Sequence, residues 1–580
     1  MKQLMLGNEA VARGLYEAGC RVVSSYPGTP STEITEYAGG YAGIDAEWAP
    51  NEKVAMEVAL GASIGGARAF CAMKHVGLNV AADPLFTASY TGVGAGLVFA
   101  VADDQGMHSS QNEQDSRHYA VAAKLAMLEP ADSAECIEYI KAGFALSEEY
   151  DTPVLLRLST RISHSQSVVE TGPRQEHPLR DYVKNPAKYV MMPANARGRH
   201  VVVEQRQASL AQLAETTPLN RIEAGSGKIG IITAGICYQY VKEAMPEASV
   251  LKLGMVNPLP TGLIRQFAQS VERLYVVEEL DGVIENHCRS IGVDVTGKEI
   301  FSNIGEFSQR TVAAALGAAV PQGAAFPEQV PVRPPVLCPG CPHRGLFYTL
   351  NKLKVMVSGD IGCYTLGALP PLSALDTCIC MGASVSGLHG YNKARGPEAA
   401  KKAVAVIGDS TFIHSGITGL VDIVYNSGIA TVVIADNSIT GMTGHQHNPT
   451  TGFDLRGNAA PAVSIEKICE AVGVRRIRVV DPNNLKELEA VLKEELAADE
   501  PSVVITRRPC ALLKTVRHAP PYRVNREACI ACKICFRIGC PAISMQEGKS
   551  SIDPTLCVGC GLCAALCPKK AIIPTESEAR

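Results

Sequence analysis

The sequence predicts an α/β protein made of several doubly wound parallel-sheet domains, with a small α+β module at the C-terminal end. Three observations predict this class. Short β-rich runs alternate with helical stretches along most of the chain, Pro-rich stretches divide it, and closely spaced cysteines crowd its C-terminal end. Alternating strands and helices indicate βαβ units, whose repetition builds parallel sheets. With 580 residues the chain is also too long for a single hydrophobic core.

Prolines mark the expected domain boundaries. Pro-rich runs lie at 321–342 and around His518 to Tyr522, and both are typical of linkers. A weaker break lies between about Gly172 and Gly227, where charged and turn-forming residues interrupt the apolar pattern. We therefore expect four domains, with the bounds 1–185, 186–330, 331–517 and 518–580.

The first predicted strand covers Arg21 to Tyr26 and turns into a helix. Thr29 is the expected N-cap of that helix, because its hydroxyl can accept a hydrogen bond from a free N–H of the first turn. Pro30 would then occupy the first helical position, and Glu33 the first turn.

Two further βαβ patterns follow. Residues 228–279 alternate apolar runs (KIGIITAG, VLKLG, LYVVEE) with helical stretches, one of them near Thr261 to Ser270. Residues 403–438 contain the run AVAVIGDS, a helix from about Ile417 to Tyr425, and the run ATVVIADNS. Each pattern predicts parallel strands joined by crossover helices.

Composition restricts the function classes. Hydrophobic residues make up 46 %, charged residues 19 %, and the formal net charge is −4, so no electrostatic signal points to nucleic acid or a membrane surface. The first residues show no signal-peptide pattern, and the most apolar stretch, Thr91 to Ala102, is too short to span a bilayer. We therefore expect a cytoplasmic location, where 20 cysteines indicate metal or iron–sulfur ligation better than disulfides.

Eight cysteines at the C-terminal end have iron–sulfur spacing. The chain reads CIACKICFRIGCP from Cys529 and CVGCGLCAALCP from Cys557. The second run is the bacterial ferredoxin pattern, and the first is the same pattern with one extra residue before Cys540. In this pattern the fourth cysteine reaches the other cluster, and Pro541 and Pro568 would end the ligand loops. The expected ligand sets of two [4Fe-4S] clusters are Cys529, Cys532, Cys535 and Cys567, and Cys557, Cys560, Cys563 and Cys540.

A pair of structural zinc sites is the alternative. Zinc modules usually present two ligand pairs separated by a dozen or more residues, whereas each run here packs four thiols together. The sequence therefore favours an electron-transfer module of ferredoxin type.

A possible cofactor motif lies upstream. The run VAVIGDS ends at Ser410, and DNS follows at 436–438, which resembles the thiamine diphosphate motif. The resemblance implies that Asp409, Asn437 and the backbone carbonyl of Ile439 hold Mg²⁺ against the diphosphate, since Mg²⁺ prefers hard oxygen ligands. Gly408 would permit a close approach of the cofactor. Ser410 stands where the motif usually has a third Gly, and a plain strand-ending turn is the alternative.

Three more segments resemble the 2-oxoacid:ferredoxin oxidoreductase family. They are ITGMTGHQHNPTTG at 439–452, YPGTPSTEI at 26–34 and NEKVAMEVALGA at 51–62. The resemblance implies that Thr29 touches the substrate and that Glu52 contacts the aminopyrimidine of thiamine diphosphate and helps to activate it. Glu57 is the competing candidate, and the spacing favours Glu52. Arg117 is a candidate clamp for the substrate carboxylate, and a solvent-exposed arginine is the alternative.

The segment CPGCPHRG at 338–345 resembles the opening of the family's diphosphate domain. In some members such a pair joins a later Gly-Cys and a distant Pro-Cys around a third cluster. The matching positions here are Cys338, Cys341, Cys363 and Cys510, with buried structural thiols as the alternative. His343 and the loop with Met381 and Gly382 are expected to line the cofactor. His445 and His447 are candidates for contacts with the substrate or for proton donation, with a structural role as the alternative.

The domain order resembles the alpha subunits of indolepyruvate ferredoxin oxidoreductases, with pyrimidine, transketolase-C-like, diphosphate and ferredoxin domains in sequence. The resemblance covers nearly the whole chain. It implies oxidative decarboxylation of aryl pyruvates with coenzyme A and ferredoxin, and a separate, smaller beta subunit in an α2β2 assembly. Pyruvate or 2-oxoglutarate as substrate, a non-oxidative thiamine diphosphate enzyme and a pure electron carrier remain alternatives.

Overall fold

The computed structural model describes residues 1–320, 322–324 and 329–575. The chain forms two compact units, 1–327 and 328–580. The expected boundary at 330/331 falls beside this division. Parts of the predicted Pro-rich linker, at 321 and 325–328, lie outside the described residues.

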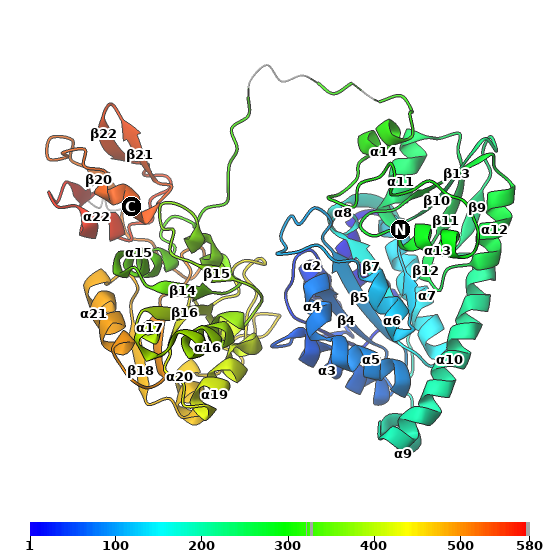
Figure 1. The fold of residues 1–580 in the computed structure, drawn as a ribbon, viewed down its shortest axis with the longest axis horizontal. Coiled ribbons are helices and arrows are strands. Elements are labelled where there is room, and N and C mark those ends of the chain that lie inside the picture. Colours follow the sequence, from blue (N-terminus) through cyan, green and yellow to red (C-terminus); the bar gives the residue numbers. More distant parts are fainter. Residues whose placement is uncertain (321, 325–328, 576–580) are drawn as a thin grey trace. The chain divides into compact units, whose positions relative to one another are not determined.

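The first unit contains a seven-stranded sheet (Figure 1). Its order is β12 (Met255–Asn257), β6 (Ala126–Leu128), β7 (Val154–Ser159), β5 (Leu97–Asp103), β4 (Ala69–Lys74), β2 (Val22–Ser25) and β3 (Asp45–Trp48). All neighbours pair in parallel except β12 and β6. From β2 the chain adds β3 on one side and β4 on the other, so the winding reverses between β2 and β4.

A four-stranded sheet completes this unit. Its order is β13 (Arg273–Val277), β10 (Ile229–Ala234), β11 (Ser249–Leu253) and β9 (Arg221–Glu223), with β9 antiparallel. The predicted βαβαβ unit is therefore confirmed. Segments 1–185 and 186–330 are closely joined, because β12 extends the first sheet and one apolar core contains Met127 and Leu155 together with Ile232 and Leu251.

The helices of the first unit pack around these sheets, and the long helix α10 runs beside α5 and α12 (Figure 1). Their bounds are α1 Gly7–Glu17, α2 Thr32–Gly39, α3 Glu52–Ile64, α4 His75–Val80, α5 Ala82–Thr91, α6 Arg117–Ala123, α7 Ser133–Glu149, α8 Thr160–His164, α9 Pro186–Tyr189, α10 Pro193–Thr216, α11 Gly235–Ala244, α12 Thr261–Gln269, α13 Val283–Ser290 and α14 Gln309–Ala315. A small antiparallel pair, β1 (Lys2–Leu6) and β8 (Gln166–Glu170), lies beside α1 and α8.

The second unit is built on a six-stranded, fully parallel sheet. Its order is β15 (Thr377–Cys378), β14 (Met356–Gly359), β16 (Ala403–Gly408), β17 (Thr431–Asp436), β19 (Ser502–Arg507) and β18 (Arg476–Val480). Strands β16 and β17 are buried at every position, as expected for central strands covered on both faces. The winding reverses between β14 and β16, which places the ends of these two strands at a switch point.

The helices of the second unit are α15 His343–Leu353, α16 Ala383–Arg395, α17 Pro397–Ala400, α18 Asp409–Thr411, α19 Ile417–Tyr425, α20 Ile465–Val472, α21 Leu485–Leu496 and α22 Leu562–Leu566. Short 3₁₀ segments lie at η1 (Cys363–Ala368) and η3 (Ile534–Ile538), and a π-turn at η2 (Phe412–Gly416). The predicted helix 417–425 is confirmed as α19, while the π-turn before it was not predicted.

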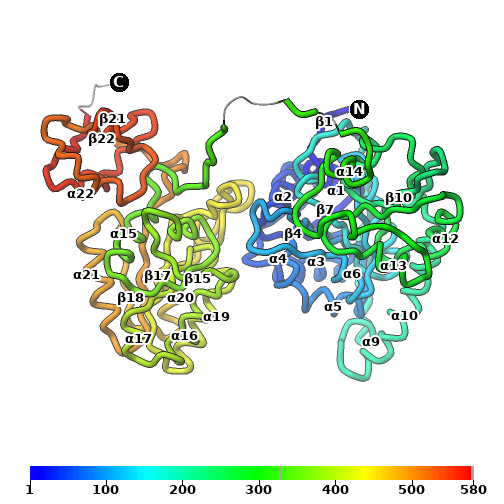
Figure 2. Tube along the Cα trace, turned by 45° about the horizontal axis from the view of Figure 1, so that its top comes forward, coloured from blue at the N-terminus to red at the C-terminus, as the bar shows by residue number. Residues whose placement is uncertain are grey.

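The cysteine-rich module belongs to the second unit and packs against α15 through η3 (Figure 2). It consists of two small antiparallel pairs, β20 (Tyr522–Val524) with β23 (Ile572–Pro574) and β21 (Ile543–Gln546) with β22 (Lys549–Ile552). The predicted fold class, parallel-sheet α/β domains with a small α+β module, is thereby confirmed. Within the described residues, none of the helices combines the length and the apolar character that a membrane crossing requires.

Candidate active site

Glu52 is the first residue of α3 and lies at the carboxyl-end edge of the first sheet, shortly after β3. Asn51 caps the helix, since its side chain accepts a hydrogen bond from the Val54 N–H at 2.9 Å. The Glu52 side chain is buried, whereas Glu57 is exposed and pairs with Lys53. Burial and position therefore favour Glu52 over Glu57 as the cofactor-activating carboxylate.

Thr29 is not an N-cap, so that prediction was wrong. Helix α2 begins at Thr32, with Ser31 as its cap. The Gly28 carbonyl accepts hydrogen bonds from the Ser31 N–H at 2.8 Å and from the Ser31 hydroxyl at 2.9 Å. This turn uses Thr29 and Pro30 as its corner residues, so Pro30 does not occupy the first helical position, whereas Glu33 does lie in the first turn. Thr29 itself is half-buried in the turn that follows β2.

Arg117 is buried in an internal ion network, contrary to the expectation of a free clamp. Its Nε and Nη2 donate to the Asp115 carboxylate at 2.9 and 2.5 Å, and its Nη1 donates to Glu278 at 2.5 Å. Nη2 also donates to the carbonyls of Glu279 and Asp281. The residue is 1 % exposed, and each nitrogen of its guanidinium already has an acceptor inside the unit. The geometry favours a role in joining the two sheets over a contact with the substrate.

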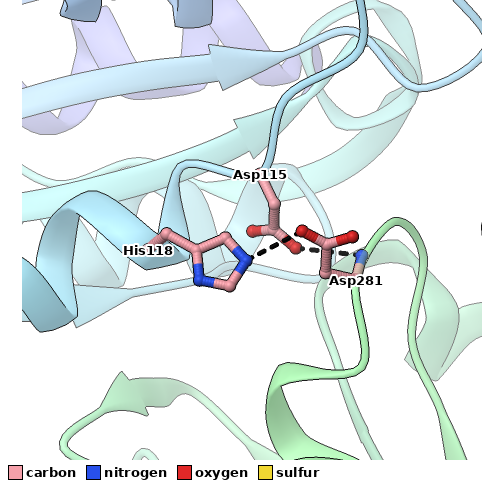
Figure 3. Close-up of side chains that lie close together, drawn as sticks. All are labelled: Asp115, His118 and Asp281. Carbon is pink, nitrogen blue, oxygen red and sulfur yellow. Dashed lines mark hydrogen bonds and ion pairs between the residues drawn. The ribbon is translucent and has the colours of Figure 1, made fainter.

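Beside Arg117, the side chains of Asp115, His118 and Asp281 converge (Figure 3). His118 Nε2 lies 2.8 Å from Asp281 Oδ2, and both groups are exposed. The Asp115 carboxylate faces Arg117 and Arg157, which hold its pKa well below the usual range despite burial. Because arginines already satisfy Asp115, the trio forms an ion-pair cluster and not a metal site.

The three predicted Mg²⁺ ligands converge in the second unit. Asp409 follows β16 and is 2 % exposed, while Asn437 and Ile439 follow β17. One terminal atom of the Asn437 amide lies 2.7 Å from the Ile439 carbonyl oxygen and 3.3 Å from Asp409 Oδ1. With nitrogen at that position the amide donates to both; with oxygen there, three oxygens converge, an arrangement that needs a cation. The donor set therefore fits a hard divalent ion.

Electrostatics at Asp409 point the same way. Burial, together with the neighbouring Asp436 carboxylate, raises the pKa of Asp409 to about 7. The segment 439–452 folds back onto this carboxylate, since Asn448 Nδ2 and Thr450 Oγ1 lie 3.4 and 3.5 Å from Asp409 Oδ2. The site is thus short of positive charge, which a bound cation would supply.

The other predicted cofactor residues surround this point. Ser410 accepts a hydrogen bond from Thr440 at 3.0 Å. The Tyr364 ring packs against Gly408, where a Cβ would come within 2.5 Å of the ring, so close packing also requires this glycine. His343 is buried, its ring meets Tyr364 edge-on at 5.8 Å, and burial lowers its pKa to about 4. It is therefore neutral at ordinary pH.

Asp360, which follows β14, was not predicted as a functional residue. Its carboxylate accepts hydrogen bonds at 3.0 Å from the N–H groups of Gly382 and Ser384, and so fixes the loop that contains half-buried Met381. The sequence signal that could have identified Asp360 is the Asp-Ile-Gly run directly after a largely buried strand. Asp409 occupies the equivalent position directly after β16.

The two loop histidines are held by their own neighbours. His445 Nε2 lies 3.6 Å from Cys510 Sγ, and His447 Nδ1 lies 3.2 Å from Thr451 Oγ1. These contacts place His445 beside the thiols discussed next and give His447 a partner within its own loop.

Four thiols from three segments meet near the thiamine motif. Cys363 begins η1 and Cys510 follows β19, and burial with the nearby Cys510 and Cys338 raises the pKa of Cys363 to about 11. Burial likewise raises the pKa of Cys341 to about 12, with smaller contributions from Cys363 and Cys338. The structure thus gathers the four cysteines predicted for a third cluster.

The eight C-terminal cysteines form the two predicted sets. Cys529, Cys532, Cys535 and Cys567 line one cavity, so the structure brings the fourth cysteine of the second run beside the first three cysteines of the first run. In the other set, the pKa of Cys563 is raised to about 12, first by burial and then by Cys560, Cys540 and Cys557. Cys540 has therefore crossed to the second run, despite the extra residue before it.

Three family models match the chain. Residues 13–216 match "Pyruvate flavodoxin/ferredoxin oxidoreductase, thiamine diP-bdg", residues 360–506 match "Thiamine pyrophosphate enzyme, C-terminal TPP binding domain", and residues 551–573 match "4Fe-4S binding domain". The last match covers the regular cysteine run only; the irregular run at Cys529 lies outside it. These matches show thiamine diphosphate-binding domains and an iron–sulfur domain.

Curated relatives match over nearly the full length. The chain is 42 % identical to the indolepyruvate oxidoreductase subunit IorA of Archaeoglobus fulgidus, over 100 % of this chain and 98 % of that protein. It is 41 % identical to the IorA subunit of Methanothermobacter marburgensis, over 98 % and 97 %. Among solved structures, a 2-oxoglutarate:ferredoxin oxidoreductase from Magnetococcus marinus aligns with 19 % identity and a TM-score of 0.47, over 55 % of this chain and 65 % of that chain. The chain therefore belongs to the family of indolepyruvate oxidoreductase IorA subunits, within the thiamine diphosphate-dependent 2-oxoacid:ferredoxin oxidoreductases.

Proposed function

We propose that this chain is the catalytic subunit that oxidatively decarboxylates aryl pyruvates, foremost indole-3-pyruvate. The products would be the aryl-acetyl-coenzyme A, CO₂ and reduced ferredoxin. The relatives named as indolepyruvate oxidoreductase subunits support the substrate, because they match the chain from end to end. Their designation as subunits supports a separate, smaller beta subunit, which we place in an α2β2 assembly. Pyruvate and 2-oxoglutarate are the competing substrates, and a non-oxidative decarboxylase is the competing reaction class.

The observation that carries the proposal is the meeting of Asp409, Asn437 and the Ile439 carbonyl beside a set of four thiols. Thiamine diphosphate, held through Mg²⁺ by these oxygens, supplies the electron sink that decarboxylation of a 2-oxo acid requires. Glu52 would hold the aminopyrimidine through one hydrogen bond made by its buried carboxyl group. In the second unit, Asp360 fixes the loop with Met381 and Gly382 at the sheet edge where Asp409 lies.

The thiol sets suggest a path for electrons. Arg344 is buried and donates hydrogen bonds to the Cys338 carbonyl at 3.1 Å and to the Ile538 carbonyl at 2.9 Å. Its guanidinium therefore links the CPGC loop to the segment that carries Cys540. We infer three [4Fe-4S] clusters, with electrons passing from the Cys338 set to the Cys540 set and then to the Cys529 set.

The Cys529 set suits the exit to ferredoxin. Cys532 is exposed, and so is the neighbouring Lys533. Lys569 lines the same cavity as the four thiols, and both it and Lys570 are exposed. Three lysines beside an accessible cluster fit an electron-carrier protein with an acidic docking surface, because complementary charge speeds and orients such encounters.

An anaerobic assay tests the proposed function. The purified complex with its partner subunit is given coenzyme A, a viologen dye, and either indole-3-pyruvate, phenylpyruvate, pyruvate or 2-oxoglutarate. We expect dye reduction with both aryl pyruvates, and only in the presence of coenzyme A. Reduction by pyruvate but not by the aryl acids would replace the substrate assignment. Release of CO₂ without dye reduction would favour the non-oxidative class.

A further inference from the structure

The winding of the first sheet points to a ligand crevice between β2 and β4. The chain leaves β2 toward β3 and returns to place β4 on the opposite side, so from β2 and from β4 it runs toward opposite ends of the sheet. In open parallel sheets ligands bind outside the carboxyl ends of the strands at such a point. Lys74 is the last residue of β4, and Thr29 lies in the turn after β2.

The turn after β2 and the end of β4 are in contact at this point. A Cβ added to Gly28 would lie 3.3 Å from the Lys74 Cβ, so the glycine lets the turn after β2 pass close to the lysine. The Lys74 ammonium donates to the Ser109 carbonyl at 2.6 Å and lies 3.4 Å from the Ser109 hydroxyl. The same hydroxyl lies 3.4 Å from the Thr29 carbonyl. Lys74 therefore lies at the carboxyl end of β4, close to the turn after β2 and bonded to the exposed residue Ser109.

Lys74 is a buried cation without an ion pair. The residue is 8 % exposed, and burial lowers its pKa to about 8. The Asp104 carboxylate raises that pKa but itself accepts hydrogen bonds from the Ser109 N–H at 2.8 Å and from the hydroxyls of Ser110 and Thr160. Among the described residues, no carboxylate comes within 4.0 Å of the Lys74 ammonium. A buried charge without a direct ion pair is costly, and an anionic ligand would complete the site.

Arg117, the cation that the sequence suggested as a carboxylate clamp, already has hydrogen-bond acceptors within the protein. Arg117 has acceptors at all three nitrogens of its guanidinium, whereas Lys74 has only a carbonyl and a hydroxyl of one serine. Three residues after Lys74, Gly77 packs directly against the Glu52 carboxylate, so the segment 74–77 joins the lysine to the predicted cofactor contact.

We propose that Lys74 binds the carboxylate of the 2-oxo acid substrate. This inference rests on the proposed function, because it assumes a 2-oxo acid in this crevice. The ammonium would exchange its bond to Ser109 for one to the ligand. The charge of the carboxylate persists until CO₂ departs, so the ion pair would hold the bound substrate and the species that precede decarboxylation about equally. Loss of such uniform binding raises KM and leaves kcat nearly unchanged.

Steady-state kinetics of the whole complex test this. Lys74→Met should raise KM for indole-3-pyruvate roughly 10- to 100-fold, the range for losing a charged hydrogen bond, with kcat within about threefold. KM for coenzyme A should not change. Lys74→Arg should retain most of the affinity, and Lys2→Met, which removes an exposed lysine from β1, should match the unmodified chain.

A pair of inert ligands gives a readout independent of turnover. Binding of indole-3-acetate and indole-3-acetamide is measured by calorimetry on the unmodified complex and on Lys74→Met. We expect the unmodified complex to prefer the carboxylate at least tenfold and the variant to lose that preference. Lys74→Gln removes the charge but can still donate to the Ser109 carbonyl, so the loop after β5 keeps its anchor. This variant should show the same rise in KM as Lys74→Met.

The outcomes separate this inference from the proposed function. An unchanged KM and an unchanged carboxylate preference in Lys74→Met, or normal KM in Lys74→Gln, would mean that the lysine only holds the loop after β5. If the unmodified complex oxidises pyruvate or 2-oxoglutarate instead, the aryl assignment fails, and the same KM comparison on that acid still decides the role of Lys74. If no 2-oxo acid is oxidised and indole-3-acetate does not bind, both proposals fail.

Discussion

Glu52 and Gly77 touch in the structure, and this contact makes Gly77 a sensitive position. A Cβ at residue 77 would come within 2.6 Å of Glu52 Oε1, so Gly77→Ala must displace the carboxylate. We expect turnover to fall at least tenfold, because the carboxylate would leave its position beside the cofactor. Gly61→Ala, in the same helix as Glu52, meets nothing within 4 Å and should leave turnover unchanged. The measurement is kcat of both variants, with the iron content as a check on folding. Equal kcat values for the two variants would mean that the position of Glu52 does not affect turnover.

Glu279 supplies a pH-dependent prediction. Burial raises its pKa from 4.5 to about 7, although the Phe307 N–H donates to it at 2.6 Å. The unfolded chain loses this proton at lower pH, so the stability contributed by the protonated group is complete below pH 4.5. It is lost as the pH rises through 7, by about 3 kcal/mol at most.

Glu279→Gln cannot ionise and should abolish that loss. Thermal unfolding of the whole protein between pH 5 and 8 should show Tm falling more steeply in the unmodified chain than in the variant. Glu272→Gln, at an exposed position, is the control and should follow the unmodified chain. Parallel curves for Glu279→Gln and the unmodified chain would contradict the raised pKa.

At the residue scale, sequence reasoning succeeds where a role depends on a local motif. Asp409, Asn437 and Ile439 follow two buried strands that pair side by side, so their convergence follows from the strand order. Lys74 was missed, since a lysine at the end of an apolar run looks like any exposed lysine. Its burial depends on a loop from after β5, which is a long-range contact.

At the element scale, the buried parallel strands were predictable because they are continuous apolar runs with clear breaks. The start of α2 was not, because the Gly28–Ser31 turn competes with the Thr29 cap for the same backbone groups. The pairing of β12 with β6 could not be foreseen either. This pairing joins Leu128 to Met255, which are far apart in the sequence, and a three-residue strand has no distinctive pattern of its own.

The proposed third cluster depends on elements that are distant in the sequence, because its four cysteines come from the loop before α15, from η1 and from the segment after β19. We expect about twelve irons per chain, since three cubanes contain four each. Cys338→Ala should lower this to about eight, with the ferredoxin-type sets intact. Cys469→Ala, which removes a buried thiol from α20 outside all three sets, should keep the full iron content. Eight irons in the unmodified protein would reduce the count to two clusters.

At the scale of the whole molecule, the two units contain different sets of candidate functional residues. The first unit contains Glu52 and Lys74, and the second contains the Asp409 oxygens and all three thiol sets. The sequence places Glu52, the Asp409 oxygens and the thiol sets in these segments, because each motif is confined to one segment, but it does not single out Lys74. The order of the thiol sets depended on the structure, since only the buried Arg344 bridge and the exposed Cys532 distinguish the inner set from the outer.

The exit at the Cys529 set can be tested by changing the acceptor. Lys569→Glu reverses a charge that lines the cavity of these thiols, so an acidic ferredoxin should bind less tightly. We expect KM for ferredoxin to rise about tenfold at low salt, and the difference from the unmodified protein to shrink at high salt, where screening weakens charge pairing. Reduction of a small viologen should be unaffected, because the dye needs no docking surface. Lys467→Glu, an exposed lysine in α20, provides the matched charge reversal and should change neither acceptor. Equal losses of activity with ferredoxin and with viologen would show that the substitution damages the cluster itself. Unchanged activity with both acceptors would mean that ferredoxin docks on another surface.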